Sequence, residues 1–100
     1  MSLPLIFRDE ALADLDEAYL WYEEQRQGLG VEFIQAIESR LEQIQSNQKQ
    51  FPRIRFVIRR AIVTRFPYAI FFIEQERFIS IIAVMHHARS PRHWQRRAPG

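Results

Sequence analysis

Apolar residues recur at helical spacing through the first half of the chain. After a short apolar run at residues 3–7, which predicts a strand, one stripe begins beyond Asp9, which we expect to cap the helix. Its members are Ala11, Leu12, Leu15, Ala18, Tyr19 and Tyr22. A second stripe consists of Phe33, Ile34, Ile37, Leu41 and Ile44. Because Gly28 and Gly30 stand between the stripes, the pattern predicts two antiparallel amphipathic helices joined by a short turn.

β-Branched and aromatic residues dominate the chain from residue 54 to residue 85. A polar stretch at residues 46–50 and Pro52 ends the second helix before this region. We expect antiparallel strands at residues 54–65, 68–74 and 77–85, separated by Phe66-Pro67 and by a turn at Gln75-Glu76. The element order is then β-α-α-β-β-β. It predicts an α+β fold in which a helix hairpin packs on a small, mainly antiparallel sheet.

The length of 100 residues predicts a single domain spanning residues 1–100. We expect its ordered core to cover residues 3–94, followed by a basic tail at residues 95–100. In the last two predicted strands both alternating sets of side chains are apolar, whereas a sheet with one wet face would alternate. Since a helix hairpin covers one face only, the C-terminal segment or a partner chain must cover the other.

Charge is distributed unevenly along the chain. Residues 1–50 carry ten acidic and four basic side chains, a balance of −6, and residues 51–100 carry two acidic and ten basic ones, a balance of +8. Of the fourteen basic residues, thirteen are Arg. The second half is therefore predicted to meet an acidic partner, either nucleic acid or an acidic protein segment, because guanidinium groups pair with phosphate and carboxylate alike.

The composition also excludes several classes of site. Without cysteine the chain has no disulfide or thiolate chemistry, and no apolar stretch is long enough to span a membrane, so we expect a cytoplasmic protein. His86, His87 and His93 make a poor metal site, because neighbouring residues of a strand face opposite ways and no carboxylate lies among them. No Gly-rich phosphate loop is present. We expect neither metal nor cofactor.

The segment from His86 to Arg97 is the densest candidate for chemistry. Histidine serves as acid or base near neutral pH, and Arg with an aromatic ring suits a phosphate or an unpaired base. The alternative is that one of the adjacent histidines is a hydrogen-bonded structural residue. On the first helix, Asp14, Asp16 and Glu17 are interpreted as solvated surface, and Trp21 as a flank residue or a partner contact.

Two patterns of residues, which together span most of the chain, resemble the sequence motifs of the RelE/ParE toxin superfamily. The first set lies on the predicted helix hairpin: Ala11, Asp14, Leu15, Glu17, Ala18, Trp21, Tyr22, Glu23, Gly28, Leu29, Gly30 and Phe33. The second lies on the last strands and the tail: Arg65, Phe66, Pro67, Tyr68, Ile70, Ile82, Ala83, Val84, His86, Arg89, Pro91 and Trp94. The resemblance implies the toxin of a type II, plasmid-stabilisation-type toxin–antitoxin system. It also implies hetero-oligomers with a cognate antitoxin that uses an acidic, partly disordered segment.

Two activities are known in that superfamily. RelE-like members cut messenger RNA on the ribosome, and ParE-like members poison DNA gyrase. In the nuclease branch an Arg of the central strand acts on the scissile phosphate, and Tyr68 stands at that place here. Trp94 lies near the place of a late Tyr of the nucleases and cannot exchange a proton usefully. These departures favour the ParE-like activity, which is binding rather than catalysis.

Three hypotheses follow, with their residues. The first is a gyrase inhibitor whose target-binding residues are Arg65, Tyr68, His86, Arg89, Arg92 and Trp94, with antitoxin contacts at Tyr19, Trp21, Tyr22, Phe71 and Ile81. The second is a ribosome-dependent endoribonuclease that uses Arg59, Arg60, His87 and Arg89. Since Arg59 and Arg60 are neighbours, we expect them to project to opposite faces of the sheet. The third is a non-toxic, toxin-like partner of an antitoxin.

Overall fold

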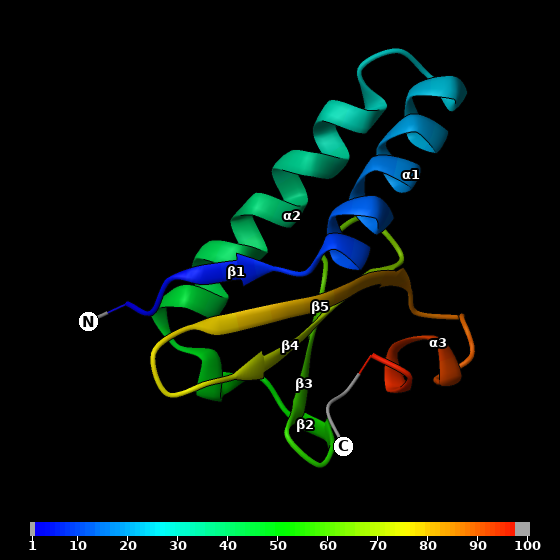
Figure 1. Ribbon diagram of the computed structural model, residues 1–100. Coiled ribbons are helices and arrows are strands. Elements are labelled where there is room, and N and C mark those ends of the chain that lie inside the picture. The colour runs from blue at the N-terminus through cyan, green and yellow to red at the C-terminus, as the bar shows by residue number, and fades with distance from the viewer. Residues whose placement is uncertain (1, 98–100) are drawn as a thin grey trace.

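The computed structural model describes residues 2–97, in which a five-stranded sheet carries a helix hairpin on one face (Figure 1). The sheet has the order β1-β5-β4-β3-β2, with β1 parallel to β5 and every other pair antiparallel. The strands are β1 (Leu5–Phe7), β2 (Arg53–Arg55), β3 (Ile58–Ile62), β4 (Tyr68–Glu74) and β5 (Ile79–His86). The helices are α1 (Asp9–Gln25), α2 (Leu29–Ser46), the 3-10 turn η1 (Gln48–Gln50) and α3 (Arg92–Gln95). The predicted α+β fold and element order are confirmed.

Helix α1 departs from its predicted pattern at two residues. Asp9 is the first helical residue and Arg8 holds the cap position, so the prediction that Asp9 caps the helix was wrong. Asp9 and Glu10 instead place two carboxylates in the first turn, where they favour the helix dipole. Leu12 is 46% exposed, because it lies at the edge of the apolar stripe and not at its centre. The stripe of α2 packs on the sheet as predicted.

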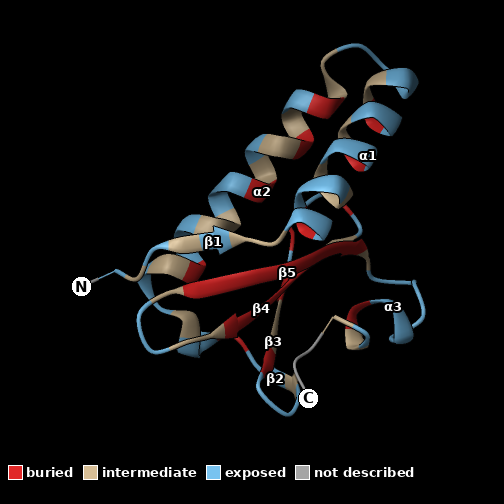
Figure 2. Ribbon diagram, viewed as in Figure 1, coloured by how far each residue is buried: buried red, intermediate tan, exposed pale blue. Residues whose placement is uncertain are grey.

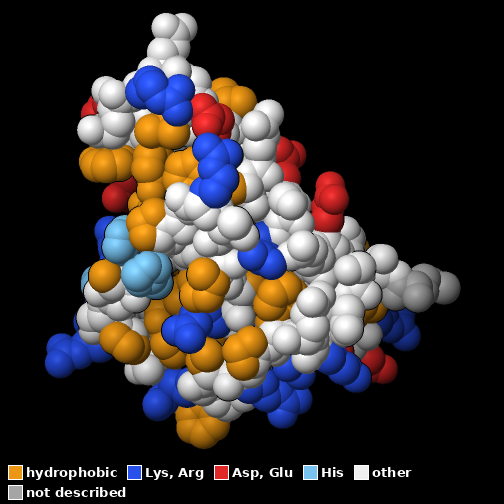
Figure 3. All heavy atoms as spheres, turned by 180° about the vertical axis from the view of Figure 1, so that it is seen from behind, with side chains coloured by type: hydrophobic (Ala, Val, Ile, Leu, Met, Phe, Trp, Pro, Cys, Tyr) orange, Lys and Arg blue, Asp and Glu red, His pale blue; other side chains and the backbone are white. Residues whose placement is uncertain are grey.

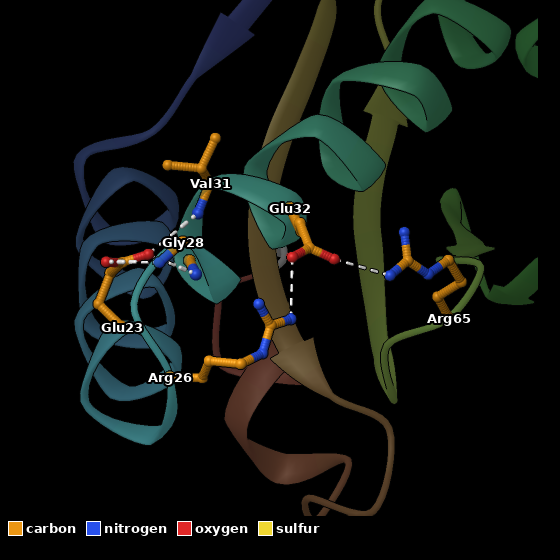
Figure 4. Close-up of polar contacts among 7 residues, drawn as sticks. Glu23, Arg26, Gly28, Val31, Glu32 and Arg65 are labelled. Atoms are coloured by element: carbon orange, nitrogen blue, oxygen red, sulfur yellow. Dashed lines mark hydrogen bonds and ion pairs between the residues drawn. The ribbon is translucent and has the colours of Figure 1, made fainter.

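The turn between α1 and α2 needs both of its glycines, for different reasons. Gly28 has a φ of +90°, a conformation that glycine adopts at little cost. At Gly30 a Cβ atom would lie 2.7 Å from the Tyr19 carbonyl oxygen, so only glycine lets the two helices approach this closely. The Glu23 carboxylate accepts hydrogen bonds from the N–H groups of Gly28 and Gly30 and so caps α2 (Figure 4).

Strand β4 is the centre of the sheet and sets its register. Tyr68 lies opposite His86 at one end of β4, and Ile73 lies opposite Ile58 near the other. The strand predicted at residues 54–65 is wrong, because β2 ends at Arg55 and β3 begins at Ile58. The two strands form a hairpin whose two-residue turn is Phe56-Val57.

The two faces of the sheet belong to two separate apolar clusters. Figure 2 shows that the strand β5 between them is buried. The larger cluster lies between the sheet and the helix hairpin and includes Tyr22, Phe33 and Phe72. The smaller one lies on the opposite face, where Trp94 of α3 stacks on Phe71 with ring centroids 5.0 Å apart. The C-terminal segment therefore covers the second face, which was one of the two predicted covers.

Contacts with the rest of the fold continue past Trp94, to residue 97. The Arg97 guanidinium pairs with the Asp14 carboxylate at 2.6 Å and donates to the Ile82 carbonyl at 3.1 Å. Asp14 also accepts a hydrogen bond from the Val84 N–H at 2.9 Å. The interpretation of Asp14 as solvated surface was therefore wrong. Its carboxylate accepts a hydrogen bond from a backbone N–H of β5 at a position that β1 is too short to reach. Residues 98–100 of the predicted tail lie outside the described residues.

Candidate functional site: an aromatic groove beside β5

A groove of about 440 Å³ runs between α1 and the ends of β4 and β5. Its lining combines aromatic, cationic and acidic groups: Glu17, Ala18, Trp21, Tyr22, Pro67, Tyr68, His86 and Arg89. We call this set the α1–β5 groove. Figure 3 shows the view from behind, in which histidine side chains lie beside hydrophobic and basic ones. The groove unites Tyr68, His86 and Arg89 of the predicted target-binding set with two predicted antitoxin contacts.

The floor of the groove is an aromatic pair held by the β4–β5 register. Tyr68 and His86 are directly opposite, with ring centroids 5.6 Å apart. Burial raises the pKa of the Tyr68 phenol and outweighs the lowering by Arg89, so Tyr68 is a neutral hydrogen-bond donor at physiological pH. His86 Nδ1 accepts the Ala88 N–H at 3.1 Å, which leaves Nε2 as the other polar atom of the ring. The floor therefore offers polar atoms carried by two aromatic rings that are inclined at 66° to each other.

The rim carries one loose ion pair. Arg89 Nη2 lies 3.9 Å from Glu17 Oε1, and both side chains are about half exposed or more. Trp21 is 54% exposed, and its ring meets that of Tyr22 edge-on, with the ring centroids 5.0 Å apart. An ion pair at this distance between solvent-exposed side chains contributes little to stability. Arg89 can therefore leave Glu17 and bind a carboxylate of a partner with little loss of free energy.

The remaining predicted contact residues lie elsewhere. Trp94 is buried against Phe71, and Ile81 is fully buried between the sheet and the hairpin, so none of these three side chains is presented to a partner in this structure. Tyr19 lies at the close approach of the two helices, beside Gly30. Arg92 is exposed on α3.

Arg65 does not line the groove and has a structural partner on α2. Glu32 of α2 bridges Arg26 and Arg65, each at 2.9 Å (Figure 4). Hydrogen bonds from these two guanidinium groups lower the pKa of Glu32. The bridge ties the helix hairpin to the β3–β4 connection. Nothing in the sequence around residue 32 marks this role, because its partners are 6 and 33 residues away.

The four residues of the ribonuclease hypothesis are not gathered. Arg59 lies opposite Phe72 on the helix face and Arg60 opposite Phe71 on the other, which confirms that they project to opposite faces. Arg59 donates to the Phe51 carbonyl at 2.6 Å and is 4.0 Å from Glu74. His87 and Arg89 follow the far end of β5.

Within residues 2–97, no group of three or more His, Cys, Asp or Glu side chains is placed to hold a metal ion. In the same range no helix has the length and apolar character needed to cross a membrane.

A comparison with protein-family models identifies one family for this chain. The family model described as "ParE toxin of type II toxin-antitoxin system, parDE" matches residues 5–91. Among solved structures, the "Chromosomal ParDE TA system from P. aeruginosa" is similar with a TM-score of 0.76 and 21% identity, over 85% of this chain and 96% of that chain. At this identity the likeness shows the fold. A comparison with curated protein sequences finds no match.

Proposed function

This chain belongs to the ParE toxin family of type II toxin–antitoxin systems, and from this premise we propose that it inhibits DNA gyrase by binding and is held inactive by a cognate antitoxin. The observation that carries the proposal is the separation of the candidate nuclease residues. Arg59 bonds to the Phe51 carbonyl on the helix face, Arg60 lies on the opposite face of the sheet with its Nε buried, and His87 follows the other end of the sheet. General acid–base cleavage needs its groups within hydrogen-bond reach of one phosphate.

The α1–β5 groove supports a binding role in two ways. It is concave and half apolar, with Trp21 exposed above Tyr68 and His86, which suits a protein segment that lays one apolar face into it. Arg89 on its rim suits an acidic residue of that segment, because its pair with Glu17 is loose. We propose that the antitoxin covers this groove and thereby blocks contact with gyrase.

The test is a supercoiling assay with purified gyrase. The wild-type chain is expected to inhibit supercoiling, and prior mixing with the antitoxin encoded beside it is expected to restore the reaction. Arg89→Ala is expected to weaken both effects, because one arginine serves both contacts. Arg77→Ala is the matched control, since Arg77 is exposed between β4 and β5 and does not line the groove.

Two outcomes would contradict the proposal. Unaffected gyrase, together with transcripts cut in a translating extract, would replace inhibition by ribonuclease activity. Unaffected gyrase, intact transcripts and normal growth on expression would leave the third hypothesis, a non-toxic partner of an antitoxin.

A further inference from the structure

The turn between β2 and β3 carries the most exposed large apolar side chain among the described residues. Phe56 is 80% exposed, and its neighbour Val57 is 48% exposed. Arg53 and Arg55 lie in β2, just before the turn, and are exposed as well. We call these four residues the β2–β3 tip. Figure 3 shows a hydrophobic side chain projecting at the lower end of the molecule, where Figure 1 places this hairpin, with basic side chains around it.

The backbone at Phe56 is strained. Its φ is +49°, in the left-handed region, where a bulky side chain is an outlier. Phe56 is the first of two residues in a hairpin turn, and when the first of these has positive φ the position is usually held by Gly, Asn or Asp. Any of these residues would close the hairpin with less strain than phenylalanine.

Folding therefore gains little from phenylalanine at this position beyond the contact of its ring with Arg55. The ring is left in water, and the backbone is held in a conformation that opposes it. The exposed ring and the strained backbone each lower the stability of the fold at the same residue. Residues that are unfavourable for stability in this way are concentrated at functional sites.

The chemistry of the tip selects the kind of partner. The Arg55 guanidinium lies over the Phe56 ring, 5.0 Å from its centroid, and Arg53 adds a second positive charge. Phenylalanine and arginine are both enriched in protein interfaces, and arginine also at their energetic centres. Val57 cannot stack on a base, so the apolar pair fits a pocket in a protein better than a strand of nucleic acid. The two cations call for an acidic rim around that pocket.

We propose that the β2–β3 tip anchors the chain to its protein target, with Phe56 and Val57 inserted in an apolar pocket and Arg53 and Arg55 meeting acidic groups around it. The inference rests on the proposed function, because it takes the target to be a protein. The tip is separate from the α1–β5 groove: Tyr68 and His86 form one end of the β4 ladder, and Ile58, which follows the tip, pairs with Ile73 near the other. Antitoxin binding in the groove does not require the tip.

The variant Phe56→Gly separates folding from binding. It removes the ring and relieves the backbone, so thermal unfolding is expected at the same temperature as in the wild type or above it. Inhibition of purified gyrase and growth arrest on expression are expected to weaken about tenfold or more, as for a central anchor residue. Affinity for the antitoxin is expected to stay unchanged. Ile6→Thr is the matched control, because Ile6 is 51% exposed on β1, at the opposite edge of the sheet.

Each alternative result has its own meaning. A Phe56→Gly chain as inhibitory and as toxic as the wild type would overturn the inference and leave the proposed function intact. If growth arrest requires Phe56 while gyrase is unaffected by the wild type, gyrase is the wrong target and the anchor stands. Phe56-dependent binding to a single-stranded oligonucleotide would overturn the choice of a protein partner. A wild-type chain that leaves both growth and gyrase unaffected would contradict both proposals.

Discussion

The two faces of the sheet are covered in very different ways. On the helix face, Tyr22, Phe33, Phe66 and Tyr68 form a cluster of aromatic rings whose centroids lie 5.0–6.0 Å apart. On the other face, a four-residue helix contributes the single ring of Trp94. The hairpin is thus part of the stable core, whereas the C-terminal cover is held by one stacked ring and by the polar contacts of Arg97 with Asp14, Ile82 and Arg8. Segments with so few contacts open first in native proteins.

Truncating one ring on each face gives the largest expected effects and tests this contrast. Phe33→Ala is expected to lower the free energy of unfolding by about 3–5 kcal/mol, because it leaves a cavity in a closed core. Trp94→Ala is expected to cost less, about 1.5–3 kcal/mol, since α3 can detach and leave no cavity. Urea unfolding of both variants measures the difference. Equal losses would mean that the C-terminal cover is as much a part of the core as the hairpin.

Smaller effects are expected from the ion pair that fastens the cover. Asp14→Asn and Arg97→Ala should each destabilise the fold, and their double-mutant cycle should give a coupling free energy of about 0.5–3 kcal/mol, because both side chains are less than one-fifth exposed. Hydrogen exchange of the Val84 amide reports the same contact directly. Additive losses with unchanged exchange would show that Arg97 does not hold the segment in solution.

The smallest effect is expected on the hairpin side, at Glu32. The pKa of Glu32 is lowered in the folded chain by its hydrogen bonds to Arg26 and Arg65. Its contribution to stability is therefore present above the unfolded pKa, which is near 4.5, and is lost as the pH falls through the lower folded pKa. Glu32→Gln should melt below the wild type at neutral pH and together with it in strong acid. A gap that persists in acid would assign the difference to packing.

Periodicity was enough to predict the helix hairpin, the strands β4 and β5, and the need for a cover on the second face. Each of these follows from residues that are neighbours in the sequence or recur at a fixed spacing. The role of Asp14 does not. Its partners Val84 and Arg97 are 70 and 83 residues away, and a carboxylate on a helix surface gives no local sign that it completes the edge of a sheet.

The β2–β3 turn shows a second limit. Residues 54–65 read as one strand because the turn contains Phe and Val, which favour strands, and lacks the Gly or Asn that normally marks a hairpin. The presence of phenylalanine in place of glycine or asparagine thus explains both why the sequence did not predict the turn and why residue 56 is strained and exposed. For the groove, the sequence predicted Tyr68, His86 and Arg89 together but separated Trp21 and Tyr22 from them, because only the tertiary fold places α1 beside β5.

Strand β1 pairs with β5 alone. Although β1 is made before the other strands, it has no hydrogen-bonding partner until residues 79–81 have been made. Arg8, directly after β1, then bonds to the carbonyl of Arg97, 89 residues downstream. The hairpin, whose contacts are local, can form during translation, but the edge of the sheet closes only when nearly the whole chain is out. The β1 edge therefore depends on contacts that span almost the whole described sequence, whereas the hairpin depends on contacts that are local in it.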